Sequence, residues 1–223
     1  MGEYVNQHGY TCYGVRLAGH ATNPQDMIRS TRTDWMASVE DAYYTLKHLS
    51  DRIFLIGLSM GGILSFLMST QLDVIGIVAM ATPYKLPNDP RLPFINLISR
   101  FISFMPKSKE LPGSGWSDPQ AWKDHISYPQ NPIRSIGELN LLLGEMRTAL
   151  PRVTAPVLLI HSKDDKYVAP ENMELIYDGL INASEKAKVY ISGSGHVVTR
   201  DAARDRVFKH AVEFIRNVES RSK

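Results

Sequence analysis

The chain has 223 residues, of which 43% are hydrophobic and 22% are charged, and its formal net charge is +2. Such a chain can bury a sizeable core, and no basic run indicates a nucleic-acid partner. No apolar run reaches the ~18 residues that a membrane span needs, and the N-terminus does not resemble a signal peptide. The single cysteine, Cys12, excludes an internal disulfide and a cysteine-based metal site. Because it also favours a reducing compartment, we expect a cytoplasmic protein, with its oligomeric state open.

The first 49 residues contain two predicted helices with a strand between them. Residues 1–9 are typical of the end of an amphipathic helix that stops near Gly9. Residues 10–17 (YTCYGVRL) are predicted to form a strand. Thr33 is predicted to cap a helix that runs to about Leu49. One face of this helix is apolar at near-helical spacing, with Trp35, Val39, Ala42, Tyr43, Leu46 and Leu49.

The stretch RIFLIGLSMGG, residues 52–62, places Ser59 between a short apolar strand and a helix. This is the G-x-S-x-G pattern, in which a strained strand-to-helix turn exposes a serine hydroxyl. Gly57 and Gly61 are expected to let strand and helix approach closely, because neither has a side chain. The turn also aims the first helix amides at the space where an oxyanion could bind. The alternative is an ordinary glycine-containing loop with no catalytic role.

A near-continuous apolar run at residues 74–80 (VIGIVAM) predicts a strand buried on both faces. The alternation of strands and helices then stops. Residues 92–105 (LPFINLISRFISFM) predict an apolar helix, and a second helix is expected over residues 136–149. We interpret residues 84–153 as a helical cap insertion over one end of a sheet. Its aromatic and methionine side chains either pack together or line an acyl pocket.

The alternation resumes in the last third of the chain. The sequence predicts strands at residues 156–160 and 188–191, a helix at 171–180 and a last helix that starts near Asp201. Strands that alternate with helices of this length imply an α/β fold with a mostly parallel sheet wrapped on both sides. Residues 1–83 and 154–223 are therefore expected to be two parts of one core, separated by the cap.

Three of the predicted strands end in residues that together could activate a hydroxyl group. These residues are Ser59, the pair Asp164 and Asp165, and His196. Functional groups gather at the carboxyl ends of parallel strands. A serine needs a base, normally a histidine that a carboxylate orients. We favour Asp165 over Asp164 because of the spacing from the strand end to Val168 and Pro170.

Other histidines compete with His196 for the role of base. His20 and His161 also lie at strand ends, whereas His8, His48, His125 and His210 lie on predicted helices or in the cap. His161 precedes the two aspartates in its own loop, where we expect it to brace the turn. His196 is favoured because Gly193 and Gly195 place it on an open loop.

Four segments resemble the motifs of the α/β-hydrolase superfamily, in particular its bacterial carboxylesterase and monoacylglycerol lipase-like branch. They are GLSMGG, HSKDDKYVAP, SGSGHVVTRD and QHGYTCYGVRLAGHATNP. The resemblance covers nearly all of the chain and is weakest over residues 85–128. It implies that Ser59 is the nucleophile, His196 the general base and acid, and Asp165 its orienting partner. It also implies that the Met60 amide is one oxyanion donor and that no metal or cofactor is needed.

The chain departs from the family pattern in two places. Gly19-His20-Ala21 stands where Gly-His-Gly is usual. Family members also begin with further strands, one of which ends in a His-Gly loop that supplies the second oxyanion amide. No counterpart precedes Met1, so we expect an N-terminally truncated fold with an unpaired strand edge.

The expected function is that of a carboxylesterase acting on a small-molecule ester. One alternative is a monoacylglycerol lipase-type enzyme, whose acyl chain would lie against the apolar residues around Phe101 and Phe104. An alternative of another class is a catalytically impaired protein that keeps the fold.

Overall fold

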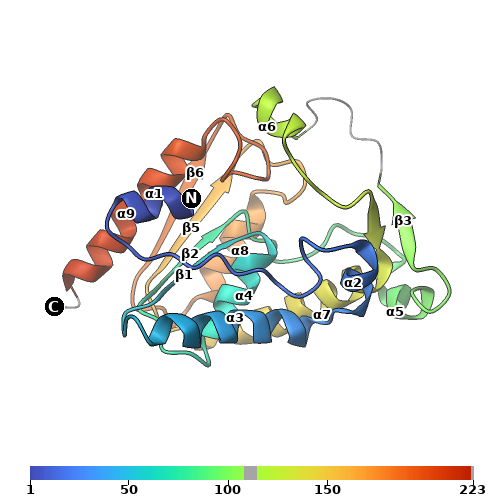
Figure 1. Ribbon diagram of the computed structural model, residues 1–223, viewed down its shortest axis with the longest axis horizontal. Coiled ribbons are helices and arrows are strands. Elements are labelled where there is room, and N and C mark those ends of the chain that lie inside the picture. The colour runs from blue at the N-terminus through green and yellow to red at the C-terminus, as the bar shows by residue number, and fades with distance from the viewer. Residues whose placement is uncertain (108–114, 222–223) are drawn as a thin grey trace.

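A parallel sheet with helices on both faces forms the core of the computed structural model, which describes residues 1–107 and 115–221 (Figure 1). The sheet holds β1 (Phe54–Leu58), β2 (Gly76–Met80), β5 (Val157–Ser162) and β6 (Lys186–Ile191), in the spatial order β1-β2-β5-β6. All three pairings are parallel. The predicted α/β class with a mostly parallel sheet is therefore confirmed.

The two central strands bury side chains on both faces. In β2, Ile77 and Ala79 belong to one hydrophobic cluster, whereas Val78 and Met80 belong to the other. This alternation follows from the two-residue period of a strand, and it explains why residues 74–80 read as a continuous apolar run. Strand β5 divides its residues between the same two clusters.

The helices cover the sheet in two layers. One layer consists of α3 (Arg32–Lys47), α4 (Met60–Ser69), α7 (Ile133–Ala149) and α8 (Glu171–Gly179), and the other of α1 (Gly2–Gln7) and α9 (Arg204–Arg221). In the second layer, the rings of Tyr4 and Phe208 lie 5.5 Å apart. No helix within the described ranges is both long and apolar enough to cross a bilayer.

Residues 10–17 do not form the predicted strand. They run as irregular backbone, and β1 lies at the edge of the sheet. A strand needs a neighbour to satisfy its backbone N–H and C=O groups. None of the sheet strands among the described residues pairs with this segment, so its apolar and β-branched residues cannot form a ladder.

The predicted helix over residues 33–49 exists but has different ends. Its N-cap is Thr31 rather than Thr33, because the carboxylate of Asp34 accepts the Thr31 N–H at 2.8 Å. Trp35 and three further residues of the predicted apolar face are buried. Leu49 lies beyond the last helical residue and is 72% exposed.

The single helix predicted over residues 92–105 is wrong. The segment contains the 3₁₀ helix η1 (Leu92–Phe94), the short helix α5 (Ile95–Ile98) and the strand β3 (Phe104–Pro106). Strand β3 pairs antiparallel with β4 (Gln130–Pro132). Helices of this length depend on a buried face, but Phe101 is 83% exposed and Ile102 52% exposed.

The remaining elements are α2 (Pro24–Arg29), α6 (Pro119–Lys123) and the 3₁₀ helix η2 (Leu150–Arg152). Helix α6 carries Trp122. Helix α7 packs its Leu142, Leu143 and Met146 into the main core. The division of the chain at residues 84 and 153 stays a prediction.

Candidate active site

Ser59 occupies a strained turn between β1 and α4. Its φ of 54° and ψ of −116° are unusual for a residue with a side chain. The Ser59 N–H donates to the carbonyl of Met80 at 2.8 Å, and the Ser59 carbonyl accepts from Gly62 at 2.9 Å. These bonds to β2 and to the first turn of α4 hold the strained backbone in place.

The glycines around Ser59 have unequal roles. A Cβ on Gly57 would lie 2.2 Å from the Gly61 backbone, as the close approach of strand and helix predicts. A Cβ on Gly61 would meet no atom within 4 Å, so the expectation for this residue is wrong. The second tight position is Gly62, where a Cβ would lie 1.9 Å from the Thr82 hydroxyl.

Asp165 lies in the loop that leaves β5, with its carboxylate buried. Its Oδ1 atom accepts the backbone N–H groups of Tyr167 and Val168, both at 2.9 Å. Its Oδ2 atom lies 2.8 Å from Nδ1 of His196. The neighbouring Asp164 instead accepts the Gly193 N–H at 2.7 Å.

His196 lies between Asp165 and Ser59. Its Nε2 atom is 3.0 Å from the Ser59 Oγ atom. A carboxylate only accepts hydrogen bonds, so Nδ1 carries the proton toward Asp165, and Nε2 of the neutral ring can accept the serine hydroxyl. The structure thus brings together the three side chains selected from the sequence, in the geometry that a general base requires.

Asp165 remains ionised in this site. Burial alone would raise the pKa of its carboxyl group, but the hydrogen bonds from His161 and His196 and from the Val168 N–H outweigh it and lower the pKa below the usual range. The negative charge can therefore stabilise a proton that arrives on His196.

The acid loop and the histidine loop are tied to each other. The Lys163 N–H donates to the Ile191 carbonyl at 2.9 Å. The Ser162 hydroxyl donates to the Ser194 carbonyl. With the bond between Asp164 and Gly193, these contacts fix Asp165 relative to His196.

The two rival histidines have other partners. His161 is buried, and its Nε2 donates to the Val168 carbonyl at 2.9 Å while lying 3.3 Å from Oδ2 of Asp165. It braces the acid loop, as its position in the sequence indicates. The His20 Nδ1 atom lies 3.2 Å from the Ala18 carbonyl, and its ring contacts Trp35 edge to face. Burial lowers the pKa of His20.

Met60 is the first residue of α4 and directly follows Ser59. The first N–H groups of a helix have no intrahelical acceptor, and they lie at the positive end of the helix dipole. The Met60 N–H therefore lies at this positive end of α4, next in sequence to Ser59; its role as an oxyanion donor stays a prediction.

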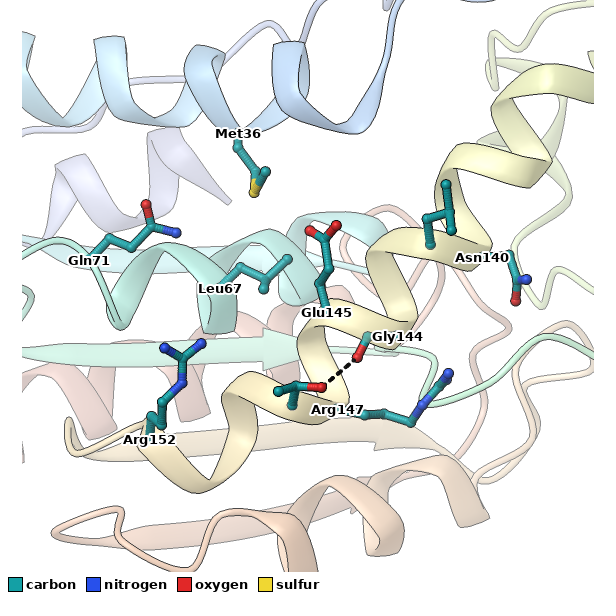
Figure 2. A pocket seen from close by; sticks show the side chains of 10 residues that line it. Met36, Leu67, Gln71, Asn140, Gly144, Glu145, Arg147 and Arg152 are labelled. Carbon is teal, nitrogen blue, oxygen red and sulfur yellow. Dashed lines mark hydrogen bonds between the residues drawn. The ribbon is translucent and has the colours of Figure 1, made fainter. Parts of the chain in front are cut away.

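A cavity of about 460 Å³ opens beside His196. Aromatic residues dominate its wall: Trp116, Trp122, His125, Tyr128 and Tyr167. A larger cavity of about 620 Å³ lies between α3, α4 and α7 and is lined by Met36, Leu67 and Leu141 among others (Figure 2). None of the three site residues lines it, so size alone does not locate the chemistry.

The sequence did not identify Asp201 as a residue of this region. It belongs to the quoted segment SGSGHVVTRD, but its partners are backbone N–H groups, some of them more than 80 positions away. A sequence pattern does not reveal such partners, because any residue except proline offers the same N–H group.

Comparisons with known proteins identify the family of the chain. A sequence model of the family described as "Serine aminopeptidase, S33" (Hydrolase_4) matches residues 1–203. The thermostable monoacylglycerol lipase of Bacillus sp. (strain H-257) is 32% identical over 96% of this chain and 82% of its own length. The carboxylesterase of Bacillus subtilis (strain 168) is 26% identical over 98% of this chain and 86% of its own length.

Solved structures show the same fold. A structure from work on LipS and LipT, two metagenome-derived lipolytic enzymes, superposes with a TM-score of 0.85 at 30% identity, covering 97% of this chain and 86% of that one. The monoacylglycerol lipase of Paleococcus ferrophilus has a TM-score of 0.71 at 19% identity, over 85% of this chain and 76% of that one. At 19% identity, the similarity to the Paleococcus ferrophilus structure supports the fold alone.

Proposed function

The chain belongs to the serine aminopeptidase S33 family of α/β-hydrolases and is a carboxylic ester hydrolase, and we propose that it works through an acyl-enzyme on Ser59. One observation carries this mechanism. The Ser59 hydroxyl, the His196 imidazole and the Asp165 carboxylate form a continuous hydrogen-bonded chain, with distances of 3.0 and 2.8 Å.

In the first half of the reaction, the Ser59 Oγ atom attacks the ester carbonyl carbon while Nε2 of His196 takes the hydroxyl proton. The tetrahedral intermediate collapses, the bond to the alcohol oxygen breaks, and His196 returns the proton to the leaving alcohol. In the second half, His196 takes a proton from water, whose oxygen attacks the acyl carbon. The second tetrahedral intermediate collapses, the bond between the acyl carbon and the Ser59 Oγ atom breaks, and His196 passes its proton to that oxygen, so that the carboxylic acid leaves and the Ser59 hydroxyl is restored.

Two further groups support these steps. The ionised Asp165 keeps the ring of His196 in the required tautomer and stabilises its charged form. The Met60 N–H donates to the oxygen that becomes negative in each tetrahedral intermediate. Neither half of the proposed reaction requires a metal or an organic cofactor.

The cavity beside His196 supports an ester as the substrate. Its indole and phenol rings offer apolar area to an acyl chain or an alcohol group, and Lys107 and Ser127 add polar atoms to the wall. A carboxylesterase is the first candidate. A monoacylglycerol lipase is the second candidate, favoured by the 32% identity to the Bacillus enzyme of that name.

Replacing Ser59 with alanine tests the mechanism. We expect Ser59→Ala to abolish hydrolysis of p-nitrophenyl esters and covalent labelling by a fluorophosphonate. Ser65→Ala, a buried substitution on the same helix that removes a hydroxyl bonded to the Gly61 carbonyl, is the matched control and keeps both signals. Labelling that persists in Ser59→Ala contradicts the proposal. Labelling of the unaltered chain without turnover favours the catalytically impaired alternative.

A series of p-nitrophenyl esters from acetate to palmitate, together with monoacylglycerols, separates the two candidates. A carboxylesterase loses kcat/KM as the acyl chain lengthens beyond the cavity. A monoacylglycerol lipase keeps or gains kcat/KM with long chains and releases glycerol.

A further inference from the structure

We propose that Asp201 is a positioning residue that holds the histidine loop and the cavity wall in one fixed arrangement. The inference rests on the proposed function, because it assigns Asp201 a role through His196 and through the residues that line the cavity.

The carboxylate of Asp201 lies where three segments of the chain meet. Asp201 has no exposed surface. Its Oδ1 atom accepts the N–H groups of Ser117 at 2.9 Å, Asp118 at 2.7 Å and Ala202 at 2.8 Å. Its Oδ2 atom accepts from Gly195 at 2.5 Å and also lies 3.0 Å from the Ser117 nitrogen. Four backbone N–H groups therefore converge on a single buried side chain.

These donors belong to the two parts of the site that must fit together. Gly195 directly precedes His196, whereas Ser117 follows Trp116 of the cavity wall. Asp118 is the N-cap of α6, which carries Trp122 of the same wall. Asp201 is thus bonded to the loop of the general base and to the segment that shapes the cavity.

The two segments also touch backbone to backbone. A Cβ on Gly195 would lie 1.7 Å from the carbonyl oxygen of Gly115. Only a residue without a side chain permits this approach. Outside the buried contact, the Arg200 guanidinium donates to the Asp124 carbonyl at 3.1 Å, and Arg204 lies 3.6 Å from the Asp118 carboxylate. These exposed contacts join the same two segments of the chain that the buried carboxylate of Asp201 joins.

The charge state of Asp201 fits this role. Burial alone would raise the pKa of its carboxyl group, but the N–H groups of Gly195, Ser117, Ala202 and Asp118 outweigh it and lower the pKa. An ionised carboxylate accepts all four bonds, whereas an amide of the same size has one acceptor atom and one donor group. Substitution by asparagine therefore breaks part of the connection without changing side-chain volume.

The test compares Asp201→Asn with Asp205→Asn. The second variant makes the same chemical change at an exposed aspartate in the first turn of α9, four positions further along the chain. For p-nitrophenyl acetate, we expect Asp201→Asn to lower kcat and the rate of fluorophosphonate labelling about tenfold to a hundredfold, the effect of a misplaced catalytic group. Asp205→Asn keeps both rates within about twofold of the unaltered chain, because the bonds that Asp201 makes to the histidine loop and to the cavity wall are unchanged.

Equal kcat and labelling rates in Asp201→Asn and in the unaltered chain, with both folded by circular dichroism, overturn the proposal. Hydrogen exchange on the unaltered chain is a second test of the proposal, and it needs no variant. The N–H groups of Ser117, Asp118 and Gly195 should exchange slowly and together. Exchange at the rate of open loops overturns the proposal even if Asp201→Asn does not fold. An unaltered chain that is not labelled contradicts the proposed function instead, and the exchange arm still tests the Asp201 contacts.

Discussion

The Oδ2 atom of Asp165 lies 3.3 Å from Nε2 of His161, four positions earlier in the chain, while its other neighbour is His196. Among the contacts of the described residues, His161 therefore lies against the Asp165 carboxylate and not against the Ser59 hydroxyl. Because the same nitrogen donates to the Val168 carbonyl, it also closes the acid loop.

Replacing His161 with phenylalanine keeps a ring in the buried site but removes the donor. We expect the loss of this bond to the Val168 carbonyl to lower the free energy of unfolding by about 1–3 kcal/mol. Urea denaturation measures this change. The value of kcat should fall much less than in Asp165→Asn, and an equally large fall would show that His161 has a direct catalytic role.

Substitutions of the two adjacent aspartates, Asp164 and Asp165, test which of them orients His196. Asp165→Asn should lower kcat/KM on the order of 10³- to 10⁴-fold, because the amide favours the wrong tautomer of His196. Asp164→Asn should cost less than about tenfold, since this carboxylate accepts a hydrogen bond from the Gly193 N–H and, among the described residues, none from the His196 ring. Steady-state kinetics on p-nitrophenyl acetate distinguishes them. The reverse order would assign the orienting role to Asp164.

The lowered pKa of Asp165 predicts how stability depends on pH. An aspartate in an unfolded chain titrates near pH ~3.9. Because the folded-state pKa is lower, the contribution of Asp165 is fully present above the unfolded value and is lost as pH falls through the folded value. Unfolding free energies of the unaltered chain and of Asp165→Asn should differ at neutral pH and converge in acid. A gap that widens in acid contradicts this sign.

Two glycines of the serine turn give opposite predictions for stability. Gly57→Ala places a Cβ against the Gly61 backbone, and such overpacking costs about 1–3 kcal/mol or more. Gly61→Ala meets open space inside a helix and should raise stability by roughly 0.5–1 kcal/mol. Thermal unfolding followed by circular dichroism compares the two. Equal melting temperatures would show that strand and helix are not in close contact here.

The two cavities predict different responses to filling. Ser127→Trp adds a large ring to the cavity beside His196 and should raise KM for long-chain esters about tenfold, because the acyl group loses its space. Thr148→Trp adds the same ring to the larger cavity and should leave KM and kcat unchanged. A chain-length series on both variants measures the difference. An effect of Thr148→Trp alone would place the substrate between α3, α4 and α7.

The parts of the fold that could be predicted depend on local patterns. The apolar strand at residues 74–80 and the serine turn are visible because burial on both faces and a strained turn demand particular residues nearby in sequence. Residues 10–17 carry an equally good strand pattern, but a strand also needs a neighbour, and no local pattern supplies one. The prediction of a single helix over residues 92–105 was wrong, because the apolar content indicated a buried helix face that the structure does not contain.

Some residues of the site could likewise be predicted from the sequence, and others could not. Ser59, Asp165 and His196 could be selected because each follows a predicted strand and because hydrolytic chemistry limits the residue types. The expectation for Gly61 was wrong, because the direction of a Cβ depends on how strand and helix cross. Asp201 could not be found, since its partners are backbone groups of a distant segment.

The contacts between the acid and histidine loops join two of the three site residues and leave out the third. Asp165 and His196 follow the neighbouring strands β5 and β6, whereas Ser59 follows β1, with β2 between. A shift of β2 relative to β5 would therefore change the distance between hydroxyl and imidazole, while the imidazole and the carboxylate would keep their relative positions.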